Sequence, residues 1–84
     1  PPSVADDLPT LLQFCNSHMA HDAEVFWVDY DGQLVHRRLL GPGESYQELT
    51  WATHPWVMRN PVTQESVLLS VGPGFVGEAM ACNM

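Results

Sequence analysis

The sequence predicts an all-β protein, a small antiparallel β-sandwich of about seven short strands. Short segments rich in aromatic and β-branched residues alternate with turns that contain glycine or proline, at intervals of roughly 8–12 residues. No stretch repeats its apolar side chains at the roughly 3.6-residue period of an amphipathic helix. The 84 residues suffice for one small domain with a limited core.

The first part of the chain predicts a lead-in, a connector and a strand. Residues 1–10 are rich in proline and polar side chains, so we expect a flexible lead-in followed by one sandwich domain over 11–84. Residues 11–16 fit a strand or the start of a helix, and 17–23 predict a polar connector. Residues 24–30 predict a strand because they combine aromatic and β-branched side chains.

The middle of the chain predicts a hairpin. Asp31-Gly32 is a strong turn signal, because glycine adopts a positive φ angle at little cost. The returning strand is expected at 33–39. Bulky and polar side chains alternate over 45–51, and this period of two predicts a half-buried strand.

The last part of the chain predicts three short strands. Pro55 has no N–H for a sheet ladder, so the strand within 54–59 should begin beside it. Residues 65–71 are apolar enough to predict a central strand, which the glycine and proline residues at 72–74 end. Residues 79–83 predict a short closing strand.

The charge balance disfavours two classes of partner. The chain has 10 Asp and Glu residues against 3 arginines and no lysine, which gives a net charge of -7. Such a surface releases few counterions from phosphates, so neither nucleic acid nor an anionic membrane is an expected partner. The longest apolar runs, such as Val25–Val28, are also far shorter than the ~20 residues of a membrane-spanning helix.

The two cysteines leave a choice between a disulfide and free thiols. A bond between Cys15 and Cys82 would close most of the chain and contribute about 4 kcal/mol in the loop-entropy view. Nothing else resembles a disulfide framework, so we expect free thiols and a reducing compartment, the cytoplasm or the nucleus. Cys15, His18 and His21 supply too few ligands for zinc and lie in a predicted turn, so we expect no metal and no cofactor.

No motif predicts catalysis. The glycine–proline turns lack the lysine and the flanking residues of a nucleotide-binding loop. His54 and a nearby hydroxyl suggest part of a hydrolytic triad, but no nucleophile elbow presents that hydroxyl. We therefore expect a binding protein and not an enzyme.

Rings and a hydroxyl gather in one short segment, at Thr50, Trp51, His54 and Trp56. One interpretation is the edge of an aromatic core in which the histidine is satisfied by its neighbours. The other is a shallow pocket with aromatic walls and two polar groups at its base. Such a pocket suits a flat apolar ring that carries one hydroxyl, and a hydroxylated proline has this chemistry.

Several short motifs occur in a specific order and spacing. Trp27-x-x-Tyr30-Asp31-Gly32 is similar to a Trp-x-x-Phe-Asp-Gly hairpin, with tyrosine in place of phenylalanine. Together with this hairpin, the chain resembles the β domain of the von Hippel–Lindau family over residues 11–84. The further matching motifs are Phe14-Cys15-Asn16, Leu40-x-Pro42-Gly43, His54-x-Trp56-x-x-Arg59 and Gly77-Glu78 through Asn83.

The resemblance implies a binding module for a peptide that contains 4-hydroxyproline, as in hypoxia-inducible factor. In the family, a serine hydroxyl and a histidine ring bond the hydroxyl of that residue, and two tryptophans wall its ring. Thr50 stands at the serine and His54 at the histidine. Trp27 and Trp56 stand at the two tryptophans.

Further positions of the implied peptide-binding surface differ from the family. Arg37 stands where the family has a tyrosine that contacts the peptide backbone. Leu49 and Trp51 stand where it has a histidine and a tyrosine beside the serine. Ala5 and Asp7 replace polar and basic residues that grip an acidic target, so we expect a different peptide sequence preference.

The resemblance also bears on protein partners. Family members that act in ubiquitin ligases carry a following helical domain, which binds elongin C and a cullin. This chain ends at Met84, so no elongin or cullin contact is expected from it. The alternative to hydroxyproline recognition is a β-sandwich that serves protein interaction or structure without this selectivity.

Overall fold

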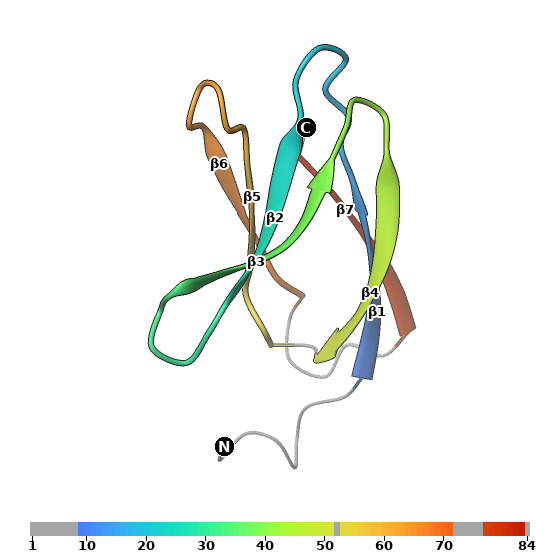
Figure 1. The fold of residues 1–84 in the computed structure, drawn as a ribbon. Coiled ribbons are helices and arrows are strands. Elements are labelled where there is room, and N and C mark those ends of the chain that lie inside the picture. Colours follow the sequence, from blue (N-terminus) through green and yellow to red (C-terminus); the bar gives the residue numbers. More distant parts are fainter. Residues whose placement is uncertain (1–8, 52, 72–76, 84) are drawn as a thin grey trace.

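The described part of the chain consists of strands and their connections. The computed structural model describes residues 9–51, 53–71 and 77–83. No helix within these ranges is long and apolar enough to cross a membrane. Figure 1 shows the strands packed as two sheets, which confirms the predicted all-β sandwich. The strands are β1 (Pro9–Cys15), β2 (Ala23–Val28), β3 (Leu34–Leu40), β4 (Ser45–Trp51), β5 (Trp56–Arg59), β6 (Ser66–Leu69) and β7 (Gly77–Cys82).

The two sheets differ in their strand directions. The smaller sheet has the order β4-β1-β7, and the larger has the order β3-β2-β5-β6. All ladders between described strands are antiparallel except the one between β1 and β7, which is parallel. A parallel pair needs a long connection, and here the chain passes through β2 to β6 before it returns beside β1. Turn signals identify hairpins, so they cannot reveal this pairing.

The core lies between the sheets and follows the alternation of β1. Leu12 and Phe14 point inward and are buried, whereas Leu11 and Gln13 are partly exposed. Val25 and Met58 enter the same cluster from the larger sheet. The Phe14 ring packs against that of Trp56, with 5.0 Å between the ring centroids. This contact holds the beginning of β5 firmly against β1.

The structure decides two of the strand predictions, one at 11–16 and one at 65–71. Residues 11–16 continue a strand that begins at Pro9, and no helix forms there. A strand forms at 66–69, but its expected central place is wrong, because among the described strands β6 pairs only with β5 and lies at the edge of its sheet. Leu68 on β6 is accordingly 70% exposed. The apolar composition of a segment indicates how much of it is buried on average. It does not determine whether the strand has a neighbouring strand on both sides. The predicted turn at 72–74 and most of the predicted lead-in lie outside the described residues.

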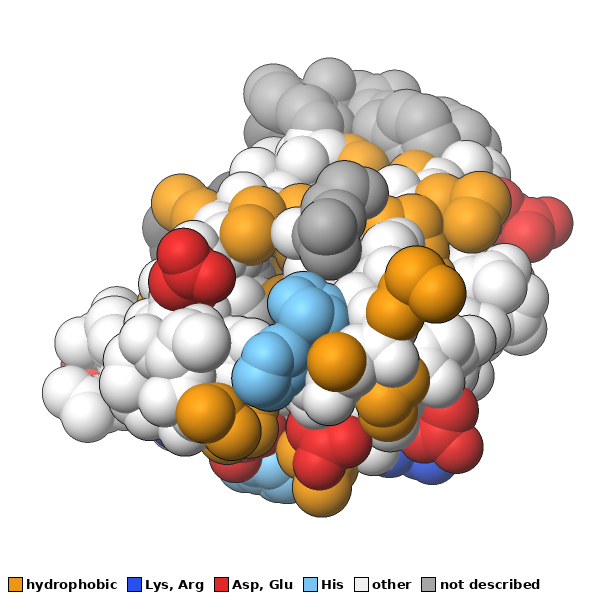
Figure 2. Space-filling view, turned by 90° about the horizontal axis from the view of Figure 1, so that it is seen from above, with side chains coloured by type: hydrophobic (Ala, Val, Ile, Leu, Met, Phe, Trp, Pro, Cys, Tyr) orange, Lys and Arg blue, Asp and Glu red, His pale blue; other side chains and the backbone are white. Residues whose placement is uncertain are grey.

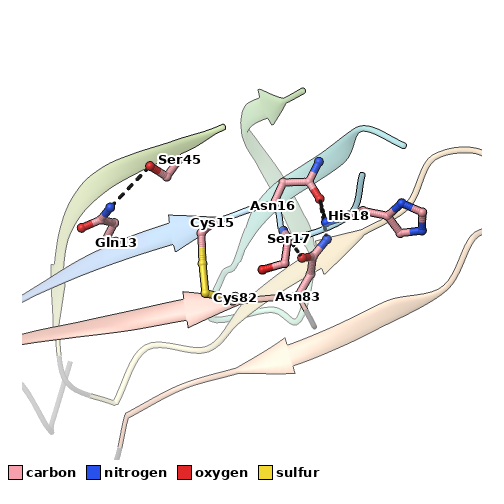
Figure 3. Close-up of a disulfide and its surroundings, with 8 residues drawn as sticks. All are labelled: Gln13, Cys15, Asn16, Ser17, His18, Ser45, Cys82 and Asn83. Atoms are coloured by element: carbon pink, nitrogen blue, oxygen red, sulfur yellow. Dashed lines mark hydrogen bonds between the residues drawn. A yellow bond between two sulfur atoms is a disulfide. The ribbon is translucent and has the colours of Figure 1, made fainter. Parts of the chain in front are cut away.

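Cys15 and Cys82 form a disulfide, so the expectation of free thiols is wrong. The two residues are partners in the parallel ladder, and their Cα atoms lie 4.6 Å apart, a separation that a disulfide spans. Figure 3 shows the bond beside two asparagines, of which Asn83 donates from Nδ2 to Asn16 Oδ1 at 2.9 Å. A covalent bond and hydrogen bonds therefore join the end of β7 to the end of β1.

Candidate functional site

A cavity of about 180 Å³ opens at one end of the sandwich, where strands of both sheets meet (lower part of Figure 1). β2, β3 and β5 contribute to it from the larger sheet, and β4 contributes from the smaller sheet. The structure brings together the seven residues that the sequence assigned to the hydroxyproline pocket and its surroundings within 27–56, and it adds one carboxylate. Ala5 and Asp7 lie outside the described residues. The lining residues are Trp27, Arg37, Glu48, Leu49, Thr50, Trp51, His54 and Trp56.

Two tryptophans provide a rigid apolar side of the cavity. Trp27 on β2 and Trp56 on β5 are ladder partners, so their side chains project from the same face of the sheet. Trp56 is buried against Phe14 in the core. Trp27 is half-buried, and its ring lies 5.7 Å from that of His54 between centroids. The sheet and the core therefore fix both indoles, and neither depends on a loop for its position.

Thr50 contributes a hydroxyl from the opposite sheet. It lies near the end of β4, where its inward position leaves the residue 6% exposed. Its hydroxyl makes no hydrogen bond to another residue in the described part of the chain. Among the described residues, the fully enclosed side-chain atoms that lack a partner do not include Thr50 Oγ1, so this oxygen retains some contact with solvent. A ligand that covered it without bonding it would cost about 1–3 kcal/mol.

His54 adds an imidazole from the connection between β4 and β5. Its backbone N–H donates to the carbonyl of Trp51 at 3.1 Å, which closes a turn. The carbonyl of Pro55 accepts from the N–H of Val28 at 3.1 Å, which ties the connection to the end of β2. On its other side, the imidazole meets Tyr30, whose Oη lies 3.4 Å from Nε2.

An ion pair forms another side of the cavity. Arg37 Nη2 on β3 lies 2.9 Å from Glu48 Oε2 on β4. Tyr46 donates its phenol hydrogen to Glu48 Oε1 at 2.9 Å. The side chain of Glu48 is only 15% exposed, so its carboxylate depends on these two donors.

The same contacts shift two pKa values. The Glu48 carboxylate raises the pKa of Arg37, first through its hydrogen bond and then through charge attraction. Burial raises the pKa of Tyr46, and the hydrogen bond to Glu48 raises it further. Both donors therefore keep their protons, and Glu48 remains the acceptor between them.

Leu49 and Trp51 occupy a different place from their neighbours on β4. They alternate with Glu48 and Thr50, so they lie on the outer side of the strand. Leu49 is 72% exposed and Trp51 is 42% exposed. Both residues line the mouth of the cavity and also present apolar surface to solvent.

The sequence interpretation missed one lining residue of the cavity, Glu48, and one residue beside it, Tyr30. Glu48 lies two positions before Thr50 on β4, so the period-two rule already places both on the same side of the strand. Tyr30 was noticed as part of a hairpin motif, but its contact with His54 joins two separate connections. The sequence carries no signal for that proximity.

The size and chemistry of the cavity limit what it can hold. Its volume is about 180 Å³. Pockets for drug-sized molecules usually reach roughly 300–1,000 Å³. The site therefore suits one small ring, with apolar contact to the indoles and polar contact to Thr50 and His54.

The described residues do not form a metal centre from the histidines near Cys15. Cys15 is used by the disulfide, and His18 accepts a hydrogen bond at Nδ1 from the N–H of Ala20 at 3.2 Å. The rings of His18 and His21 instead contact each other, with 4.5 Å between centroids. Within the described ranges, no group of three or more His, Cys, Asp or Glu side chains is arranged to hold a metal ion.

A larger cavity of about 350 Å³ lies at the opposite end of the sandwich. Figure 2 views this end and shows histidine side chains among apolar and acidic ones. Its amides serve the fold, because Asn60 Oδ1 accepts from the N–H of Val62 at 2.8 Å and Asn83 bonds Asn16. The described residues that line it include no tryptophan. The aromatic cavity at the other end is therefore the better candidate for recognition of a ring.

Comparison with known proteins supports the resemblance seen in the sequence. The family model described as VHL beta domain matches residues 3–81 of the 84-residue chain. The matched range contains every residue that lines the aromatic cavity. No curated protein shows a significant match to the chain.

Proposed function

The chain belongs to the VHL beta domain family, whose members are protein-interaction domains, and from this premise we propose that it binds a peptide containing 4-hydroxyproline. The observation that carries the proposal is Thr50, a residue only 6% exposed that lines the aromatic cavity and whose hydroxyl has no hydrogen bond to another described residue. A ligand hydroxyl would satisfy it.

In this proposal, the proline ring lies against Trp27 and Trp56 at the inner end of the cavity. A saturated ring with polarised C–H bonds packs well on the face of an indole, and a cavity of about 180 Å³ suits one such ring. The hydroxyl of the proline ring then reaches Thr50 and His54, which line the same cavity. The remainder of the peptide leaves past Leu49 and Trp51, the exposed residues at its mouth.

Selectivity for the hydroxyl is expected because an unmodified proline would leave polar groups of the site without a hydrogen bond. The Thr50 hydroxyl and the His54 ring nitrogen that does not face Tyr30 would both be covered by the ligand and left without partners. Each such group costs about 1–3 kcal/mol. Together they imply a preference of roughly 30-fold to several-thousand-fold for hydroxyproline over proline.

Calorimetric titration with matched peptides tests the proposal. One peptide carries 4-hydroxyproline, a second carries proline, and a third carries hydroxyproline with the opposite configuration at the hydroxyl-bearing carbon. We expect heat of binding only, or far more strongly, with the first peptide. Equal affinity for all three would overturn the proposal, because a site shaped by two polar groups distinguishes both the presence and the direction of the hydroxyl.

A second candidate function is protein interaction without hydroxyproline selectivity. The exposed outer side of β4 favours it, since Leu49 and Trp51 present apolar surface that needs no hydroxyl on a partner. The same titration separates the two functions. Binding that is insensitive to the hydroxyl but is lost in Leu49→Asp would support this second function.

A further inference from the structure

We propose that Tyr30 is a positioning residue, which holds the proton of the neutral His54 ring on Nδ1 and so makes His54 the donor to the ligand hydroxyl. Thr50 is then the acceptor of the hydroxyl proton. This inference rests on the proposed function, because it assigns directions to the two hydrogen bonds at the same site. It concerns a residue that lies outside the lining of the cavity.

Three rings meet beside the cavity. Tyr30 Oη lies 3.4 Å from His54 Nε2, and the centroids of these two rings are 5.9 Å apart. Both rings contact Trp27, with centroid distances of 5.8 Å for Tyr30 and 5.7 Å for His54. Each ring is therefore in contact with the other two, and the imidazole presents Nε2 to the phenol.

The backbone that carries Tyr30 is held in a defined turn. Asp29 Oδ1 accepts from the N–H of Asp31 at 2.9 Å and from the N–H of Gln33 at 2.8 Å. Gly32 adopts a φ of 81°, and its N–H donates to the carbonyl of Asp29 at 3.0 Å. The side chain of Tyr30 is exposed, yet the hairpin fixes the point from which it extends.

The chemistry of the two groups favours one direction for their hydrogen bond. A neutral imidazole carries one ring proton, so one nitrogen donates and the other accepts. A phenol O–H is a stronger donor than a neutral imidazole N–H, and a bare imidazole nitrogen is a stronger acceptor than a phenol oxygen. The favoured bond therefore runs from Tyr30 Oη to Nε2, which leaves the ring proton on Nδ1.

The consequence is a division of roles at the ligand hydroxyl. Nδ1–H of His54 donates to the hydroxyl oxygen, and the hydroxyl hydrogen is free to reach Thr50 Oγ1. The separation of 3.4 Å between Tyr30 and His54 is long for such a bond. Contacts of this kind often tighten when a ligand closes the site. Tyr30→Phe keeps the ring and removes only the hydroxyl, so it isolates this contribution.

Nitrogen NMR of the free protein tests the proton position without any ligand. We expect the wild-type His54 ring to show a protonated Nδ1 and a bare Nε2. In Tyr30→Phe, the population should move toward the ring form protonated at Nε2. Tyr46→Phe is the matched control, since it removes the phenol that bonds Glu48, and it should leave the His54 signals unchanged. A wild-type ring protonated at Nε2, or identical signals in Tyr30→Phe, would overturn the inference.

Titration of the same variants links the proton position to recognition. We expect Tyr30→Phe to weaken binding of the hydroxyproline peptide by roughly 3- to 10-fold and to leave the proline peptide unchanged. An equal loss for both peptides would make Tyr30 a packing residue and would sink the inference. If wild-type protein fails to distinguish the two peptides, the proposed function falls, while the spectra of the free protein still decide the position of the proton.

Discussion

Arg37 on β3 and Glu48 on β4 form an ion pair that crosses from one sheet of the sandwich to the other. The two strands lie at corresponding edges of their sheets, so the pair joins the edges beside the aromatic cavity. Arg38 adds a second contact across the same edge, because its guanidinium lies 4.5 Å from the centroid of the Tyr46 ring. Arginine side chains therefore hold together the side of the sandwich at which the site is built.

The first prediction concerns this ion pair. Arg37→Met should lower the free energy of unfolding by about 1–2 kcal/mol, since it leaves the mostly buried Glu48 carboxylate with one donor fewer. The double variant Arg37→Met with Glu48→Leu should recover most of this loss, because no charge is left unpaired. Urea denaturation of both variants measures the effect. A double variant less stable than Arg37→Met would contradict this, because the loss of stability could then not be assigned to an unpaired Glu48 carboxylate.

The second prediction concerns the hydroxyl of Thr50. Thr50→Val preserves the shape of the side chain and should weaken binding of the hydroxyproline peptide by roughly 10-fold. Binding of the proline peptide should not change, because that ligand never bonded the hydroxyl. Thermal unfolding should show a variant at least as stable as the wild type, since a hydroxyl without a described partner is removed from a nearly buried position. Parallel losses for both peptides would identify Thr50 as a packing residue.

The third prediction concerns the disulfide. Replacement of both Cys15 and Cys82 by alanine should lower the free energy of unfolding by about 4 kcal/mol, because the bond closes a loop with a sequence separation of 67 residues. Urea denaturation of the oxidised wild type, the reduced wild type and the double variant measures this. The reduced wild type and the variant should agree. A variant as stable as the oxidised protein would contradict the role assigned to the bond.

The fourth prediction concerns alkaline pH. The raised pKa of Tyr46 means that the folded protein keeps this proton when the unfolded chain, whose tyrosines ionise near pH ~10, has lost it. The folded state then binds more protons, so the free energy of unfolding should fall as the pH rises above about 10. Tyr46→Phe removes the proton and should flatten this dependence. Equal slopes in the two proteins, measured by urea denaturation across this range, would refute the assignment.

Local pattern predicted the parts of the molecule that depend on local chemistry. The turn signal at Asp31-Gly32 corresponds to a hairpin in which Gly32 has a positive φ. The alternation over 45–51 predicted a half-buried strand, and β4 forms there with Thr50 inward and the bulky Leu49 and Trp51 on its exposed side. The cavity residues near Trp56 were found because several rings and a hydroxyl lie close together in sequence.

Long-range pairing decided what the sequence could not show. The place of β6 at a sheet edge, and of Cys15 beside Cys82, depends on which strands become neighbours across many intervening residues. Glu48 was overlooked because a single glutamate in a strand usually faces solvent, and its partner Arg37 comes from the other sheet. Contacts of this kind follow from the assembled fold and not from any segment of it.

The parallel pairing of β1 and β7 determines how the molecule would carry tension. If the reduced protein were pulled from Pro9 and from Cys82, these points would lie at opposite ends of one ladder, and the force would act along the strands as shear. In the oxidised protein, the disulfide would instead carry the force from the end of β1 directly to Cys82, so the ladder would not be sheared. Residues 16–81 would then lie outside the load path, and the aromatic cavity would keep its shape while the chain is stretched.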